Sequence, residues 1–106
     1  MNLTNEIVFG IYELSENEYV ASLIEECEGK EVLAEVKAKL LTTRESVAYK
    51  IALGSKDYGA LYDLIVKKLS CDKLKPSELT SDLVLSMGMV IVFRSRLSEE
   101  SRKLFS

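Results

Sequence analysis

Arg94 and Arg96 are the side chains in this sequence best suited to bind an anion. They follow the longest charge-free run, the eleven residues Leu83–Phe93, and precede Glu99 and Glu100. The forked donors of arginine fit carboxylates and phosphates. No glycine-rich phosphate loop accompanies the arginines, so two interpretations stay open. They form an anion-binding site with Glu99, or they form surface ion pairs worth about 0–1 kcal/mol each.

Residues for catalysis or metal binding are scarce. The chain has no histidine, the one side chain that titrates near neutral pH without a shifted pKa. Cys27 and Cys71 are 44 residues apart and have no further cysteine to complete a metal site. We therefore expect a non-enzymatic protein with no catalytic residue, cofactor or metal. The two cysteines are expected to be reduced and structural, and a bridge between them stays open.

Negative charge is concentrated in the first third of the chain. Residues 1–36 contain nine glutamates and one lysine, a net charge of −8, whereas residues 37–106 carry +5. One interpretation is a solvated charged surface. The other is a docking surface for a basic protein that handles nucleic acid, because complementary potentials speed and orient docking. The candidate partner-binding residues are Glu16, Glu18, Glu25, Glu26 and Glu28. Direct binding of nucleic acid is disfavoured by this charge.

The N-terminal half has patterns of a strand, a helix and a hairpin. Alternating apolar residues predict a strand over residues 4–13. Ser15 and Glu18 form a capping-box pattern before apolar residues at helical spacing, which predicts a helix that ends at Gly29. Alternation resumes over residues 31–41 and 46–54 and predicts two hairpin strands.

The C-terminal half predicts a second helix over residues 57–70 and a buried last strand, Met87–Arg94, with a short helix after it. Residues 77–87 fit either a helix or a strand. The predicted fold is therefore α+β, with the ferredoxin-like order β-α-β-β-α-β, an antiparallel sheet and helices on one face. It occupies residues 1–106 as a single α+β domain, and Leu23, Ile24, Leu61 and Ile65 are expected to be buried.

Length and composition also indicate where the protein is located and whether it forms an oligomer. A charge-free run of eleven residues is too short to span a bilayer, which takes about 20 residues, and the N-terminus lacks a secretion signal. We expect an intracellular protein. A chain of 106 residues buries a modest share of its surface, which favours a homodimer. Thirteen glutamates, ten lysines and no glutamine are typical of hyperthermophilic sources.

In length, composition and predicted element order, the whole chain resembles the type I-D anti-CRISPR proteins of rod-shaped archaeal viruses. The resemblance implies a dimeric viral inhibitor that acts in the host cytoplasm. Its implied partner is the Cas10-like large subunit of a type I-D interference complex.

Two segments are similar to the viral ring nucleases, which degrade cyclic tetra-adenylate. "IALGSKDYGALYDLIVKKL" is similar to that family's Gly-His stretch and following helix, and "VIVFRSRLSEE" to its late strand. This resemblance places Arg96 and Glu99 at functional positions, and Ser55 replaces the catalytic histidine. The alternative function is therefore a cyclic-oligonucleotide binder or a degraded ring nuclease that uses Arg94 and Arg96.

Overall fold

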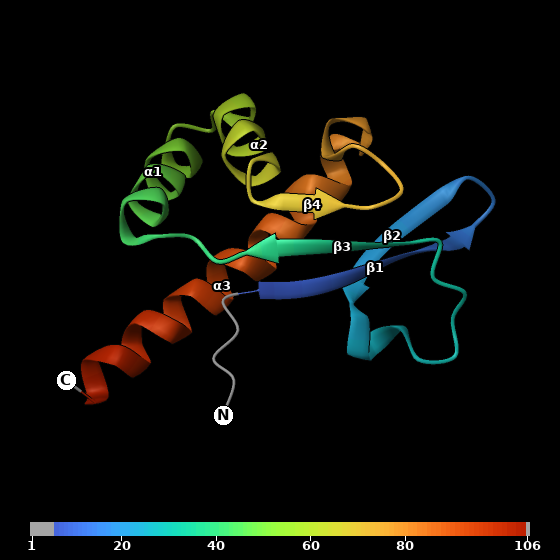
Figure 1. The fold of residues 1–106 in the computed structure, drawn as a ribbon. Coiled ribbons are helices and arrows are strands. Elements are labelled where there is room, and N and C mark those ends of the chain that lie inside the picture. Colours follow the sequence, from blue (N-terminus) through green and yellow to red (C-terminus); the bar gives the residue numbers. More distant parts are fainter. Residues whose placement is uncertain (1–5, 106) are drawn as a thin grey trace.

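The computed structural model describes the backbone of residues 6–105 and the side chains of residues 6–95 apart from Ser77. Three strands come first, and two helices, a short strand and a long helix follow (Figure 1). In chain order the elements are β1 (Glu6–Ser15), β2 (Glu18–Leu23), the 3₁₀ helix η1 (Ile24–Cys27), β3 (Ala34–Lys39), α1 (Thr43–Gly54), α2 (Tyr58–Val66), β4 (Leu69–Cys71), the 3₁₀ helix η2 (Pro76–Glu78) and α3 (Ser81–Phe105).

The four strands form one antiparallel sheet in the order β2-β1-β3-β4. Phe9 of β1 lies opposite Leu23 of β2 and Val36 of β3, so these residues share one face of the sheet. Ile7 and Ile11 of β1 lie on the same face and are buried. The predicted α+β class with an antiparallel sheet is confirmed, and β1 and β3 correspond to the predicted strands 4–13 and 31–41.

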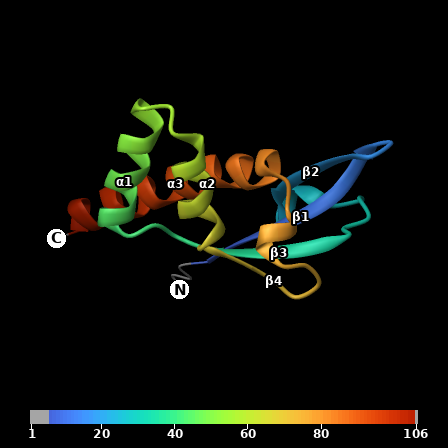
Figure 2. The ribbon, with the colours of Figure 1, turned by 90° about the horizontal axis from the view of Figure 1, so that it is seen from above.

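The long helix α3 covers the apolar face of the sheet. Val84, Met87 and Ile91 recur at helical spacing and have 0%, 1% and 0% of their surface exposed. Figure 2 shows α3 passing behind α1 and α2, with its first turns next to β2. Leu61 and Ile65 of α2 complete the core, as predicted.

Two close contacts fix α3 against its neighbours. A Cβ atom added to Gly88 would lie 2.8 Å from Cγ1 of Ile65, so glycine lets α2 and α3 approach each other. Two turns further along α3, the Ser95 hydroxyl donates to the Ile91 carbonyl at 2.7 Å and accepts from the Leu41 amide at 2.9 Å. This buried serine joins α3 to the segment between β3 and α1.

The predicted helix that ends at Gly29 is wrong, because its first part is strand β2 and its second part is η1. Asn17 adopts a left-handed conformation with φ of 59°, which turns the chain back after β1. The Ser15 hydroxyl donates to the Glu18 carboxylate at 2.6 Å, so this pair braces a hairpin turn and caps no helix. Leu23 and Ile24 are only partly buried.

The predicted strand 46–54 is also wrong, because these residues belong to helix α1. The preceding threonine starts the helix: Thr42 Oγ1 accepts from the Glu45 amide at 3.2 Å, and Glu45 Oε1 accepts from the Thr42 amide at 2.9 Å. This reciprocal pair is a capping box. The alternating Val47 and Ile51 are exposed, so their spacing did not mark a buried face.

The predicted last strand, Met87–Arg94, lies inside α3. A run that is apolar on every side fits a central strand or a covered helix equally well, and length favours the helix. The segment 77–87, which fitted either a helix or a strand, forms part of η2 and the first turns of α3. The short helix predicted after the last strand is the final part of α3. The element order therefore differs from the predicted ferredoxin-like order. The predicted helix 57–70 corresponds to α2, which ends at Val66, before β4.

Candidate protein-binding surface

The five predicted partner-binding glutamates are all exposed, and they bracket strand β2. Glu16 and Glu18 lie at the tip of the β1–β2 hairpin, whereas Glu25, Glu26 and Glu28 lie in or just after η1. The rise of a strand separates the two groups by roughly 17 Å, from about 3.3 Å for each residue between Glu18 and Leu23. The prediction that they share one helix is wrong. We refer to these five residues as the acidic surface.

Two hydrogen bonds to glutamate side chains stabilise the left-handed turn at the tip of the β1–β2 hairpin. The Asn17 amide donates to Glu13 Oε1 at 3.1 Å, and Ser15 bonds to Glu18. Glu13 and Glu18 therefore brace the turn, and Glu16 stands between them with an exposed carboxylate. This arrangement presents charge at the end of a braced hairpin.

The buried thiol of Cys27 anchors η1 to the sheet. Cys27 Sγ lies 3.4 Å from the Leu23 carbonyl, 3.7 Å from that of Ser22 and 3.8 Å from that of Gly10. A Cβ atom added to Gly10 would lie 2.8 Å from Cys27 Sγ, so glycine makes room for the thiol. This contact sets the position of Glu25, Glu26 and Glu28 relative to β2.

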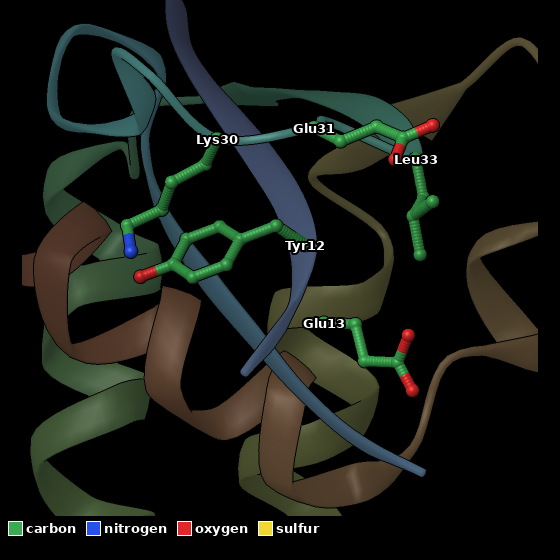
Figure 3. A pocket seen from close by; sticks show the side chains of 5 residues that line it. All are labelled: Tyr12, Glu13, Lys30, Glu31 and Leu33. Carbon is green, nitrogen blue, oxygen red and sulfur yellow. The ribbon is translucent and has the colours of Figure 1, made fainter. Parts of the chain in front are cut away.

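The one basic residue of the acidic third, Lys30, lies over an aromatic ring. Its ammonium group is 4.8 Å from the centre of the Tyr12 ring, a cation–π distance. Figure 3 shows both side chains beside a shallow hollow, with Glu13, Glu31 and Leu33 around it. The hollow holds about 240 Å³, which is below the roughly 300–1,000 Å³ of small-molecule pockets. It does not indicate a small-molecule site.

The carboxylates of this region have no cationic partner among the described side chains. Within residues 6–95, the one ion pair joins Lys68 to Glu45, away from the acidic surface. The opposite edge strand, β4, is flanked by Lys67, Lys68, Lys73 and Lys75. The asymmetry of charge along the sequence is therefore also an asymmetry between the two edges of the sheet.

The predicted anion-binding residues do not form a described cluster. Arg94 is exposed on α3, and Ser95 beside it is buried. Arg96 and Glu99 belong to the backbone of α3, but their side chains lie outside the described residues. The interpretation that the arginines emerge from the end of a strand is wrong.

The two thiols and the two side chains with shifted pKa values do not gather into one site. Cys27 and Cys71 are free thiols, near opposite edges of the sheet. Burial alone would raise the pKa of Glu45, but hydrogen bonds from Lys68 and Thr42 outweigh it and hold that pKa below its ordinary value. Burial raises the pKa of Tyr49. Among the described residues, no group of histidine, cysteine, aspartate and glutamate side chains could hold a metal ion.

No protein-family model, curated protein or solved structure matches the chain. Within residues 6–105, every helix is too short or too polar to cross a membrane. The assignment of function therefore depends on the geometry and charge of the chain itself.

Sequence reasoning found the acidic residues but missed what positions them. Gly10 and Cys27 lie in separate elements, and neither has a neighbour in the sequence that signals their contact. Ser95 was hidden between two arginines. In contrast, the Thr42-x-x-Glu45 capping box was visible in the sequence and marks the start of α1.

Proposed function

We propose that this protein is a non-enzymatic inhibitor that docks its acidic surface on a basic, nucleic-acid-handling protein. The observation that carries the proposal is the set of exposed carboxylates around β2 that lack cationic partners among residues 6–95. Such carboxylates compete with phosphate groups for the same lysine and arginine side chains. Bound in that way, the protein would block access of nucleic acid to its partner.

The resemblance to type I-D anti-CRISPR proteins narrows the proposed partner to the Cas10-like subunit of a type I-D complex. On this proposal the protein acts in the host cytoplasm as a viral inhibitor. The Arg94 and Arg96 alternative has less support, because the segment similar to a late ring-nuclease strand is helical here.

A charge-reversal experiment tests the proposal. Glu16, Glu25 and Glu28 are changed together to lysine, since all three are exposed and none has a side-chain hydrogen bond among the described residues. The control changes Asp63, Asp72 and Asp82 to lysine, which alters net charge equally at exposed sites outside the acidic surface. Surface plasmon resonance measures binding of each variant to the purified Cas10-like subunit.

We expect the acidic-surface variant to lose roughly tenfold or more in association rate, because surface charges steer encounters over about 8 Å at physiological salt. The control variant should bind nearly as the wild type does. Loss of binding in an Arg94→Ala and Arg96→Ala double variant would contradict the proposal if the glutamate reversals had no effect. A thermal shift with cyclic tetra-adenylate would then favour the nucleotide alternative.

A further inference from the structure

Strand β2 is an open edge of the sheet. In the strand order β2-β1-β3-β4, β1 is its one hydrogen-bonded neighbour among residues 6–105. Figures 1 and 2 both show the tip of the β1–β2 hairpin extending away from the helices, whereas the rest of β2 contacts α3. An edge strand has a row of unpaired backbone N–H and C=O groups, which are the groups that a further strand would bind.

The direction of these backbone groups follows from one hydrogen bond on the other side of β1. The Leu33 amide donates to the Ile11 carbonyl at 2.8 Å, so the Ile11 carbonyl faces β3. Because carbonyl directions alternate along a strand, the Gly10 and Tyr12 carbonyls face β2.

The register of the hairpin then identifies the free groups of β2. Gly10 and Tyr12 lie opposite Ser22 and Val20, which therefore direct their backbone groups toward β1. Tyr19 and Ala21 alternate with them and direct their N–H and C=O groups outward. Leu23 is excluded, because its carbonyl is the one nearest Cys27 Sγ, at 3.4 Å.

The β2 edge has fewer protective features than β4, because the irregularity of the hairpin is confined to Glu13–Ser15 of β1, near its tip. Residues Glu18–Leu23 contain no lysine and no proline. The opposite edge is protected, because β4 has three residues and lysines on both sides. The two edges therefore differ in length and in charge.

We propose that β2 binds an extended, lysine- or arginine-bearing segment of the partner as an added strand. Tyr19 and Ala21 supply the backbone hydrogen bonds. Glu16 and Glu18 at one end, and Glu25, Glu26 and Glu28 at the other, pair with the basic side chains of the segment. Charge complementarity selects this occupant, because a second copy would bring its own −8 segment against this one. The inference rests on the proposed function, since it specifies how the acidic surface docks.

Amide hydrogen exchange of the wild-type protein tests the inference. The probe is a synthetic peptide of about ten residues that alternates lysine with valine, a pattern that suits an added strand. In the free protein, the Tyr19 and Ala21 amides should exchange quickly and the Val20 and Ser22 amides slowly. With the peptide at ten times its Kd, exchange at Tyr19 and Ala21 should slow roughly tenfold.

The remaining outcomes overturn the inference in different ways. If the peptide binds and Tyr19 and Ala21 exchange as before, strand addition is wrong and the proposed docking of the acidic surface stands. Slow exchange at these amides in the free protein, which becomes fast on dilution, would place a second copy on β2. Failure of the peptide to bind also overturns strand addition. The proposed function is then tested separately, by the binding of the charge-reversal variants to the Cas10-like subunit.

Discussion

Gly10 determines how closely η1 approaches the sheet. Its position would bring an alanine Cβ to 2.8 Å from Cys27 Sγ and to 3.1 Å from Ile24 Cδ1. Both neighbours come from η1, and the thiol is short and buried. The acidic surface around β2 therefore depends on a buried residue that carries no charge.

We expect Gly10→Ala to lower the free energy of unfolding by about 1–3 kcal/mol, because an added methyl group overpacks this site. Cys27→Ala removes the nearest atom, so the double variant should lose less stability than the two single variants together. Urea denaturation of the three variants measures this coupling. Strictly additive losses would show that the thiol does not limit the space at Gly10.

At the scale of elements, glycine has opposite effects in two helices. An alanine Cβ at Gly88 in α3 would lie 2.8 Å from Ile65, whereas one at Gly54 in α1 would have no atom within 4 Å. Alanine has a higher helix propensity than glycine by about 1 kcal/mol. Packing and propensity therefore oppose each other at Gly88 but not at Gly54.

We expect Gly88→Ala to destabilise the protein by about 1–3 kcal/mol. Gly54→Ala, the matched control, should leave stability unchanged or raise it by up to about 1 kcal/mol. Thermal unfolding followed by circular dichroism compares the two. A stabilised Gly88→Ala variant would mean that α2 moves away from α3 at little cost.

The ion pair between Glu45 and Lys68 links the start of α1 to the turn before β4. The folded-state pKa of Glu45 is lowered, so its charge stabilises the fold above the unfolded value, near 4.5. This contribution disappears as the pH falls through the lower folded-state pKa.

Glu45→Gln should therefore cost about 0.5–1 kcal/mol at pH 7, and the difference from wild type should vanish below that pKa. Glutamine can still accept the capping hydrogen bond, so the variant isolates the charge. Urea denaturation from pH 7 to pH 3 provides the comparison. A difference between the variant and the wild type that did not shrink as the pH fell would assign the effect to the cap.

The elements differ in how clearly the sequence marks them. Ile7, Phe9 and Ile11 alternate and are all buried, so β1 was predictable, and Val36 and Ala38 marked β3 in the same way. Tyr19 to Cys27 fit a helix by spacing, but pairing with β1 after the turn at Asn17 outweighs that local pattern. The segment Met87–Phe93 is apolar on all sides, so its sequence does not show which side is buried. Packing against the sheet buries Met87 and Ile91.

The candidate site was predictable in composition but not in shape. The glutamates were identified from the charge count alone. Their arrangement around β2 depends on the hairpin turn and on the contact between Gly10 and Cys27. Both are three-dimensional features with weak sequence signals.

At the scale of the whole molecule, α3 has two exposed apolar side chains on the side that faces away from the core. Met89 and Phe93 are 70% and 61% exposed, one turn apart, on the side opposite the buried Val84, Met87 and Ile91. They belong to the charge-free run, so two copies can meet there without opposing like charges. This side suits the homodimer predicted from the sequence.

We expect light scattering at micromolar concentrations to give the mass of a dimer. Phe93→Glu should shift the mass toward that of the monomer, because it places two like charges in the contact. Ile51→Glu, at a residue 65% exposed on α1, is the control and should leave the dimer intact. A monomer mass for the wild-type protein would remove the prediction.

The enclosed thiol of Cys27 also makes the chain a reporter of its own local opening. Cys27 is 4% exposed beneath η1, whereas Cys71 on β4 is partly exposed. A thiol-alkylating reagent therefore modifies Cys71 first, and it reaches Cys27 only when η1 lifts from Gly10. In a Cys71→Ser variant, the rate of alkylation equals the fraction of time for which this end of the sheet is open, multiplied by the alkylation rate of a fully exposed thiol. A partner strand that closes over β2 would slow that chemistry without contacting the sulfur.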